Sequence, residues 1–190
     1  MRLHLNKPGI RALGIAESFR QKERWSILAG VVMRSDFVVD GVAIGRTSVG
    51  GNDATAAIAS LLRRLRRNDV NLLMVSGAIL SLYNIVDVDL LSSKTRLPVV
   101  CLTYKETAGI EDSIRRHFPI DADAKLLAYR ALGTRVPVRL STGHTVYVRA
   151  AGMEAGETRK VLDSFTLQGS IPEPVRVAKL FARASRAAQS

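Results

Sequence analysis

The chain has 190 residues, 47% hydrophobic and 24% charged, and this balance predicts one globular domain over residues 1–190 rather than a disordered or fibrous chain. A total of 28 Lys and Arg against 17 Asp and Glu gives a net charge of +11, which favours a polyanionic partner, although the same charge also serves solubility. Aromatic residues make up 5%, which argues against a base-stacking sheet, and no apolar run reaches the length of a membrane span.

Motifs exclude several enzyme classes. The sequence has no P-loop, no dinucleotide-binding glycine motif and no nucleophile elbow, so interpretations as a kinase, a dinucleotide-binding enzyme or a serine hydrolase with a nucleophile elbow lose support. Its three histidines lack metal-ligand spacing, which argues against a zinc site. The single cysteine, Cys101, lies in an apolar run and is expected to pack in the core. The amino terminus lacks the apolar segment of a secretory signal, so we expect a cytoplasmic protein.

The first part of the chain predicts three strands and a helix. Runs rich in Val and Ile indicate strands over residues 10–18, 25–34 and 36–49, the last two joined as a hairpin at the polar turn around Ser35. In residues 54–67, Ile58, Leu61 and Leu65 recur at helical spacing. Asp53 stands directly before this helix and is a natural N-cap.

The second part alternates strands and helices. We expect, in chain order, a buried strand over 71–77, a helix over 82–95, a buried strand over 97–104, helices over 108–118 and 121–132, a strand pair over 136–141 and 144–150, and helices over 154–165 and 172–187. A three-strand antiparallel meander followed by parallel βα units predicts a mixed α/β sheet with helices on both faces, which is the order found in ribonuclease-H-like folds.

Acidic side chains near strand ends are the candidates for chemistry, because ligands of α/β sheets bind beyond the carboxyl ends of the strands. A two-metal nuclease needs several carboxylates at one point, since Mg²⁺ prefers oxygen ligands. Glu17 ends the first strand and Asp53 precedes the first helix, and these are the better candidates. Asp87 and Asp89 fall on the predicted helix 82–95, and Asp40 lies within the third strand. Asp53 could equally be a plain N-cap, and Asp40 in its Asp-Gly pair is more often structural.

Two basic elements could contact phosphates. The first is the run around the end of the first helix, Arg63, Arg64, Arg66 and Arg67. The second lies on one face of the last helix at spacings of three and four, namely Arg176, Lys179, Arg183 and Arg186. Either would supply non-specific affinity for nucleic acid, and the alternative is a solvated face that serves solubility.

Five segments together resemble a known family. KPGIRALGIAES, GGNDAT, SGAILSLYNIVDV, LPVVCLTY and GSIPEPVRVAKLFARA, in this order, are similar to the archaeal endonuclease dU family, a relative of endonuclease V. The similarity spans nearly the whole chain. It implies a ribonuclease-H-like fold and cleavage of DNA that contains deaminated bases such as deoxyuridine, dependent on Mg²⁺ or Mn²⁺.

The sequence departs from the endonuclease V pattern at two expected carboxylates. The first-strand aspartate of endonuclease V would match Ala16, and the Asp-Gly expected after the fourth strand is Ser76 and Gly77. Glu17, next to Ala16, could substitute only if the strand bends or ends there, because neighbouring side chains on a strand point to opposite faces. Ser76 could hydrogen-bond a phosphate or be a simple structural replacement.

Other positions keep the family pattern. Asp53 matches an Asp-Ala-Thr motif, and Asn84 with Asp87 matches an Asn-x-x-Asp element, so the resemblance implies that these residues line one cleft. The leading hypothesis is a metal-dependent DNA endonuclease in which Glu17 and Asp53 hold the cation and Asp87 joins them in the site. The rivals are a nucleic-acid-binding protein without catalysis and an enzyme acting on a small phosphorylated ligand.

Overall fold

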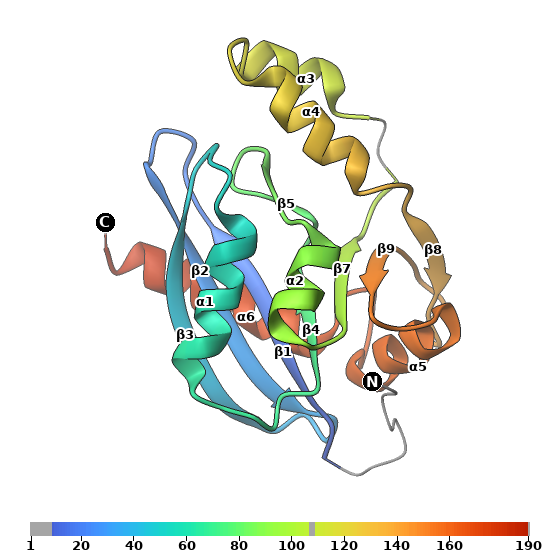
Figure 1. Ribbon diagram of the computed structural model, residues 1–190. Coiled ribbons are helices and arrows are strands. Elements are labelled where there is room, and N and C mark those ends of the chain that lie inside the picture. The colour runs from blue at the N-terminus through green and yellow to red at the C-terminus, as the bar shows by residue number, and fades with distance from the viewer. Residues whose placement is uncertain (1–8, 107–108, 190) are drawn as a thin grey trace.

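A seven-stranded mixed sheet forms the centre of the computed structural model, which describes residues 9–106 and 109–189 (Figure 1). The strands lie in the order β3-β2-β1-β4-β7-β9-β8, and a separate two-stranded sheet pairs β5 with β6. The strands are β1 (Arg11–Ser18), β2 (Trp25–Arg34), β3 (Val39–Ser48), β4 (Leu72–Val75), β5 (Ile79–Leu80), β6 (Asn84–Ile85), β7 (Val99–Thr103), β8 (Val136–Arg139) and β9 (Thr145–Ala151). The helices are α1 (Ala54–Leu65), α2 (Val88–Thr95), α3 (Glu111–His117), α4 (Ala122–Ala131), α5 (Ala155–Phe165) and α6 (Glu173–Ala187).

The pairing of the strands confirms the predicted mixed sheet. β1 runs antiparallel to β2 and parallel to β4, and β4 runs parallel to β7. The carboxyl ends of β1, β4 and β7 therefore meet at one edge of the sheet, where α/β proteins usually place their ligands.

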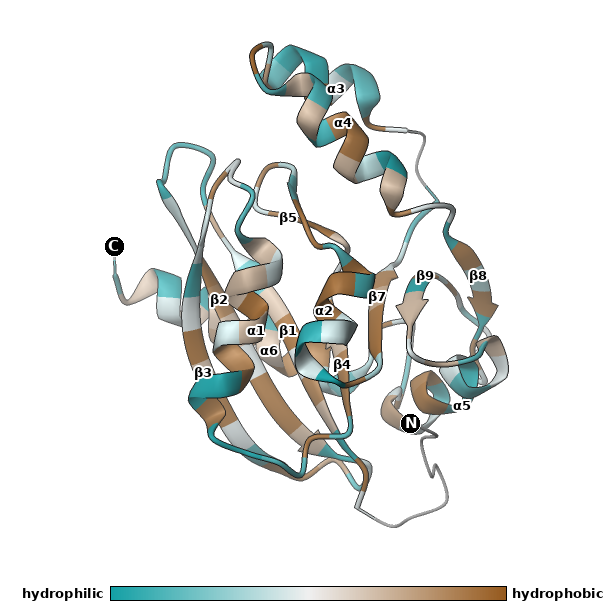
Figure 2. Ribbon diagram, viewed as in Figure 1, coloured by the Kyte–Doolittle hydropathy of each residue, from teal (hydrophilic) through white to brown (hydrophobic). Residues whose placement is uncertain are grey.

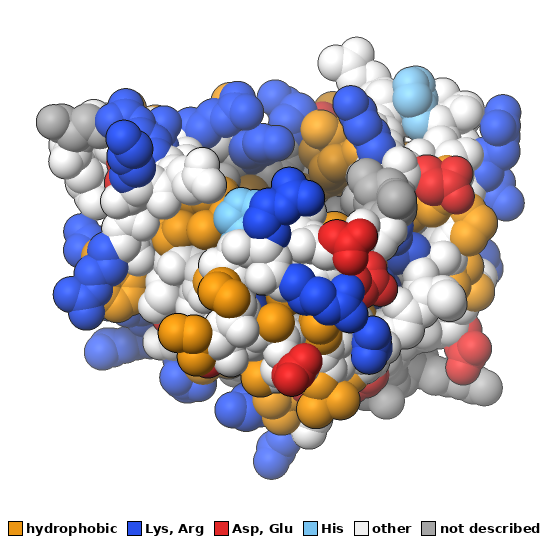
Figure 3. Space-filling model, turned by 90° about the horizontal axis from the view of Figure 1, so that it is seen from above, with side chains coloured by type: hydrophobic (Ala, Val, Ile, Leu, Met, Phe, Trp, Pro, Cys, Tyr) orange, Lys and Arg blue, Asp and Glu red, His pale blue; other side chains and the backbone are white. Residues whose placement is uncertain are grey.

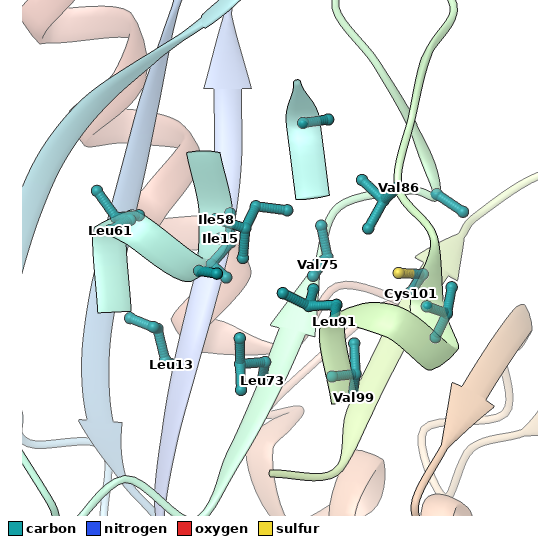
Figure 4. Packing of buried hydrophobic residues seen from close by; sticks show 14 of the residues in the cluster. Leu13, Ile15, Ile58, Leu61, Leu73, Val75, Val86, Leu91, Val99 and Cys101 are labelled. Carbon is teal, nitrogen blue, oxygen red and sulfur yellow. The ribbon is translucent and has the colours of Figure 1, made fainter. Parts of the chain in front are cut away.

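Helices cover both faces of the sheet, and alternate residues of β1 pack against different helices. Leu13 and Ile15 join a cluster with Ile58 and Leu61 of α1 on one face (Figure 4). Ala16 packs with Ala178 of α6 on the other face. The strands in the middle of the sheet are accordingly apolar along most of their length (Figure 2). Alternation along the strand thus gives each helical layer its own half of the core.

The hairpin of α3 and α4 projects beyond the sheet, between β7 and β8 in the chain (Figure 1). Lys125 of α4 anchors it, because its buried ammonium donates to the carbonyl of Gly51 at 2.8 Å, to Asn52 Oδ1 at 2.9 Å and to the carbonyl of Tyr83 at 3.2 Å. The same ammonium lies 4.5 Å from the ring centre of Phe118, a distance at which a cation and an aromatic face attract.

The expected helix over residues 82–95 is wrong in its first half. Ser81, Leu82 and Tyr83 form a left-handed turn, β6 follows, and α2 begins only at Val88. Hydrogen bonds from the turn to distant residues override the helical spacing of the apolar side chains, as tertiary contacts commonly do. Asp87 is consequently the N-cap of α2 rather than a residue within a helix.

Two other predicted boundaries shift. The first helix ends at Leu65, with Arg66 left-handed at its C-cap, so that Arg63 and Arg64 lie on the helix while Arg66 and Arg67 follow it. The helix expected from residue 108 begins at Glu111, and Ala108 lies outside the described residues. Within residues 9–106 and 109–189, every helix is too short or too polar to cross a membrane.

Candidate active site

Glu17 lies near the carboxyl end of β1 and ties three segments together. Its Oε2 accepts a hydrogen bond from Ser26 Oγ of β2 at 2.6 Å, and its Oε1 accepts one from the backbone N–H of Ser81 at 2.7 Å. The hydroxyl of Ser81 also donates to Oε2. Both carboxylate oxygens therefore hold the turn that follows β5.

That turn is strained. Ser81, Leu82 and Tyr83 have φ values of 39°, 61° and 61°, and none of them is glycine. A non-glycine residue in the left-handed region costs roughly 1–3 kcal/mol, so the surrounding contacts must hold the turn in place. They do so from several directions, because the Ser81 carbonyl accepts from Gly50 N at 2.6 Å and the Tyr83 carbonyl accepts from Lys125. Backbone strain of this kind concentrates at functional sites.

Asp53 lies at the other side of the same turn and accepts hydrogen bonds with both oxygens. Its Oδ1 accepts from Thr47 Oγ1 at 2.8 Å, from Ser48 N at 3.0 Å and from Asn84 Nδ2 at 2.6 Å, and its Oδ2 accepts from Ser48 Oγ at 3.0 Å. Burial by itself raises the pKa of Asp53, but the bonds from Asn84, Thr47 and Ser48 outweigh it and lower the pKa below its usual value.

The cap of α1 comes from a distant residue. Asp53 occupies the N-cap position, as predicted, but its side chain does not cap the helix. Asn84 Oδ1 instead accepts from the backbone N–H of Ala54 at 2.9 Å, while its Nδ2 holds Asp53 and the carbonyl of Ser48. This fully buried asparagine therefore fixes both the start of α1 and the position of the aspartate.

The structure brings Glu17, Asp53 and Asn84 together around residues 81–84. We call this set, with Ser26, Thr47, Ser48 and Ser81, the acid network. The buried polar residues Ser26, Thr47 and Ser81 were missed from the sequence, where each stands in or beside an apolar strand and gives no signal of its own.

Ala16 does not belong to this network. It is buried against Val31 and Ala178, on the face opposite Glu17, as alternation along a strand requires. A carboxylate at position 16 would therefore point toward α6 rather than toward Asp53.

The other predicted acids lie elsewhere. Asp87 is exposed and caps α2 by accepting from Leu90 N at 2.9 Å, and with Asp89 it lines a groove of about 630 Å³ under α4. Asp40 is held at 2.8 Å by Arg11 and at 3.0 Å by Arg67, which supports its structural interpretation.

Ser76 and Lys179 line a separate pocket of about 270 Å³ at the ends of β4 and β7. The serine follows β4 directly, and its backbone N–H donates to the carbonyl of Ile15 at 2.9 Å. Ser76, one of the predicted cleft residues, is therefore bonded to β1 but lines a different cavity from the groove beside Asp53.

Some of the predicted basic residues form ion pairs, and others line surface grooves. Arg67 is in ion pairs with Asp69 and Asp40, and Arg176 is paired with Glu173. Arg63 lines two grooves, one of about 790 Å³ with Arg46, Arg64 and Asp53, and one of about 430 Å³ with Arg66, Arg67 and Lys94. Lys and Arg side chains are also spread over the face seen from the side of the α3–α4 hairpin (Figure 3).

The acid network does not fit a two-metal centre as it is arranged. All four oxygens of Glu17 and Asp53 accept hydrogen bonds from the protein, whereas a cation needs carboxylate oxygens directed at it. Among the residues that the structure describes, no three His, Cys, Asp or Glu side chains come close enough to share an ion.

Comparison with known proteins identifies relatives over most of the chain. The endonuclease dU family model matches residues 8–186. A UPF0215 protein of Pyrobaculum aerophilum is 37% identical over 175 residues, covering 92% of this chain and 93% of its own, and one of Thermococcus kodakarensis is 31% identical over 194 residues, covering 97% and 96%.

Solved structures show the same fold. A protein of unknown function from Archaeoglobus fulgidus has a TM-score of 0.79 at 25% identity, covering 93% of this chain and 98% of its own. Human endonuclease V has a TM-score of 0.65 at 16% identity, covering 100% of this chain and 92% of its own. Endonuclease V of Ciona intestinalis, solved with DNA containing an inosine followed by a ribo-adenosine, has a TM-score of 0.63 at 12% identity, covering 96% and 87%. The fold is thus ribonuclease-H-like, and the chain belongs to the endonuclease dU family.

Proposed function

We propose that this protein is a DNA endonuclease that acts at deaminated bases such as deoxyuridine, with the acid network as its reaction centre. The observation that carries the proposal is the match of the endonuclease dU model across residues 8–186. The likeness to an endonuclease V solved with inosine-containing DNA supports a nucleic-acid strand as the substrate.

The acid network supplies two carboxylates, one of which lines a basic groove. Asp53 is kept ionised by its hydrogen bonds and stands beside the groove that Arg46, Arg63 and Arg64 line. In this proposal the arginines hold the phosphates of the strand, and the carboxylates of Glu17 and Asp53 orient the attacking water. Lys125 and the strained turn keep the two acids in place.

Cleavage of labelled DNA duplexes tests the proposal. Matched duplexes with one uracil, one inosine or no lesion are incubated with purified protein in Mg²⁺, in Mn²⁺ and in neither. We expect wild type to cut the lesion-containing strands, and Glu17→Gln and Asp53→Asn each to lower the rate by at least 100-fold. Asp112→Asn, which alters an exposed acid of α3, is the control and should cut normally. An uncut duplex under every condition would refute the proposal.

The requirement for Mg²⁺ or Mn²⁺ at Glu17 and Asp53 stays a prediction. Calorimetry with each cation, on wild type and on the Glu17→Ala, Asp53→Ala double variant, tests it directly. Heat of binding in wild type that disappears in the double variant would place the ion at these acids. Binding that survives in the double variant would place it elsewhere.

A second candidate function is nucleic-acid binding without cleavage. It is favoured by one observation, that every oxygen of Glu17 and Asp53 already accepts a hydrogen bond from the protein. Salt-dependent DNA binding with no product under any metal condition would support this function over the first, because phosphate contacts release counterions.

A further inference from the structure

The pocket of about 270 Å³ at the carboxyl ends of β4 and β7 has no part in the acid network. Ser76 follows β4, and Thr103 and Tyr104 lie at the end of β7. Tyr129 of α4 and Lys179 of α6 line the pocket from outside the sheet. Its position is the one at which open α/β sheets bind ligands.

The lining of this pocket is cationic. Arg135, Arg149 and Lys179 line it, and the described lining residues include no Asp or Glu. Arg149 donates through Nε and Nη2 to the carbonyls of Leu132 and Gly133, at 3.0 to 3.2 Å, but these acceptors carry no full charge. Burial lowers the pKa of Arg149, and the positive charge of Arg135 lowers it further. An anion between the two guanidinium groups would relieve both effects.

A buried hydroxyl adds a neutral donor. The Tyr104 hydroxyl is shielded from solvent and has no partner in hydrogen-bonding geometry among the described residues, although Ser76 lies beside it. Burial raises the pKa of Tyr104 to about 12, against a smaller opposing effect of Ser76, so the phenol keeps its proton. A buried hydroxyl without a partner is unfavourable, and a ligand oxygen in the pocket would accept its hydrogen bond.

We propose that this pocket binds a phosphate group of a nucleic-acid strand, with Arg149, Lys179 and the Tyr104 hydroxyl as donors. The proposal rests on the proposed function and adds the part of the substrate that this cavity recognises. Ile79, Leu102 and Ile110 line its remaining wall and offer an apolar surface to the adjoining sugar.

A strand explains the location better than a free phosphate does. Ser76 joins the pocket to β1 through its bond to the Ile15 carbonyl, two residues before Glu17. In the proposed arrangement, a strand with one phosphate in the pocket passes β1, the strand that carries Glu17. The basic side chains spread over this side of the molecule would hold its neighbouring phosphates (Figure 3).

The test measures binding of a fluorescently labelled DNA duplex by anisotropy over a series of salt concentrations, without divalent cations, so that cleavage plays no part. Lys179→Gln should weaken binding about fivefold to tenfold and reduce the slope of log K against log salt by about 0.7–0.9, the contribution of one phosphate contact. Tyr104→Phe removes one oxygen that has no protein partner and should weaken binding about threefold while the folded protein keeps its melting temperature. Lys160→Gln, an exposed lysine of α5, is the matched control and should change affinity less than twofold.

Equal binding by Lys179→Gln, Tyr104→Phe and Lys160→Gln would overturn the inference. So would a Lys179→Gln variant that loses affinity for inorganic phosphate, followed by NMR, but binds DNA like wild type, because the pocket would then serve a small phosphate rather than a strand. These outcomes differ from failure of the proposed function, which is the absence of cleavage by wild type that binds DNA normally.

Discussion

Asn84 connects the fold to the acid network, and replacing it should affect both. Asn84→Ala removes the acceptor for Ala54 N at the start of α1, and the loss of such a cap costs about 1 kcal/mol. It also removes the 2.6 Å bond to Asp53, and a hydrogen bond to a charged group is worth about 1.5–3 kcal/mol. The Ser48 carbonyl loses its side-chain donor, at about 1 kcal/mol. The sum is a destabilisation of about 3.5–5 kcal/mol.

Urea unfolding followed by circular dichroism measures this loss. The midpoint should fall while the slope m stays constant, because the surface exposed on unfolding is unchanged. At about 2–4 °C per kcal/mol for a chain of this size, the melting temperature should drop by roughly 10 °C. Asn68→Ala, at an exposed position after α1, is the control and should stay within about 0.5 kcal/mol of wild type.

A second substitution at the same position gives a pH signature. Asn84→Asp keeps an acceptor for Ala54 N but places a second carboxylate against Asp53, and the pair can hold only one negative charge at low cost. The folded pKa of the pair then lies above the unfolded value of about 4, so the variant is near wild-type stability at low pH and loses stability as the pH rises through the folded pKa. A loss below about 1 kcal/mol for Asn84→Ala, or a pH-independent loss for Asn84→Asp, would refute this account of the network.

Three further predictions follow from single residues. The pKa of Asp53 is lowered in the folded state, so its contribution to stability is full above the unfolded pKa and is lost as the pH falls through the folded pKa. Asp53→Asn should therefore flatten the acid limb of a curve of unfolding free energy against pH, and an unchanged acid limb would contradict this. Lys125→Met leaves the acceptors at Gly51, Asn52 and Tyr83 without their donor. The rate of amide hydrogen exchange in α3 and α4 should therefore rise, and an unaltered rate would contradict the role of Lys125 as the anchor of this hairpin. Burial raises the pKa of Cys101 to about 12, so the folded protein at pH 8 should resist a thiol reagent until denaturant is added; rapid labelling without denaturant would contradict the burial.

The sheet was predictable because each of its strands has a local sequence pattern that is typical of a strand. β1, β2 and β3 are long runs of β-branched and small apolar residues between polar turns, and β4 and β7 are short continuous apolar runs of the kind that parallel sheets bury. These patterns are local, so the sequence discloses them without knowledge of any partner.

The turn at residues 81–83 could not be predicted because nothing local requires it. Leu82, Val86 and Leu90 have helical spacing, yet the segment adopts left-handed backbone because Glu17, Gly50 and Lys125 hold it from three distant parts of the chain. Tertiary contacts of this kind leave no periodic trace in the sequence.

Three members of the candidate site were predictable, but its hydroxyl groups and its grouping were not. The family resemblance singled out Asp53 and Asn84, and position at a strand end singled out Glu17, and the structure links these three. The family resemblance also grouped Asp87 with them. The direction of the Asp87 side chain depends on where α2 begins, and that boundary was misplaced. The end of the first helix was also misplaced, because the left-handed C-cap at Arg66 takes Arg67 off the helix and into ion pairs, while the role of the arginine run in nucleic-acid binding stays a prediction.

The left-handed turn at residues 81–83 couples ligand binding at Glu17 to the backbone conformation of the turn. Ser81 occupies both oxygens of the carboxylate, so a ligand that takes either oxygen competes with the turn for the same lone pairs. Release of Ser81 lets three strained residues relax, and the energy they give up, roughly 1–3 kcal/mol each, offsets part of the lost hydrogen bonding. By linkage, any variant that relaxes the turn in the free protein changes the affinity of Glu17 for a ligand without touching the ligand itself.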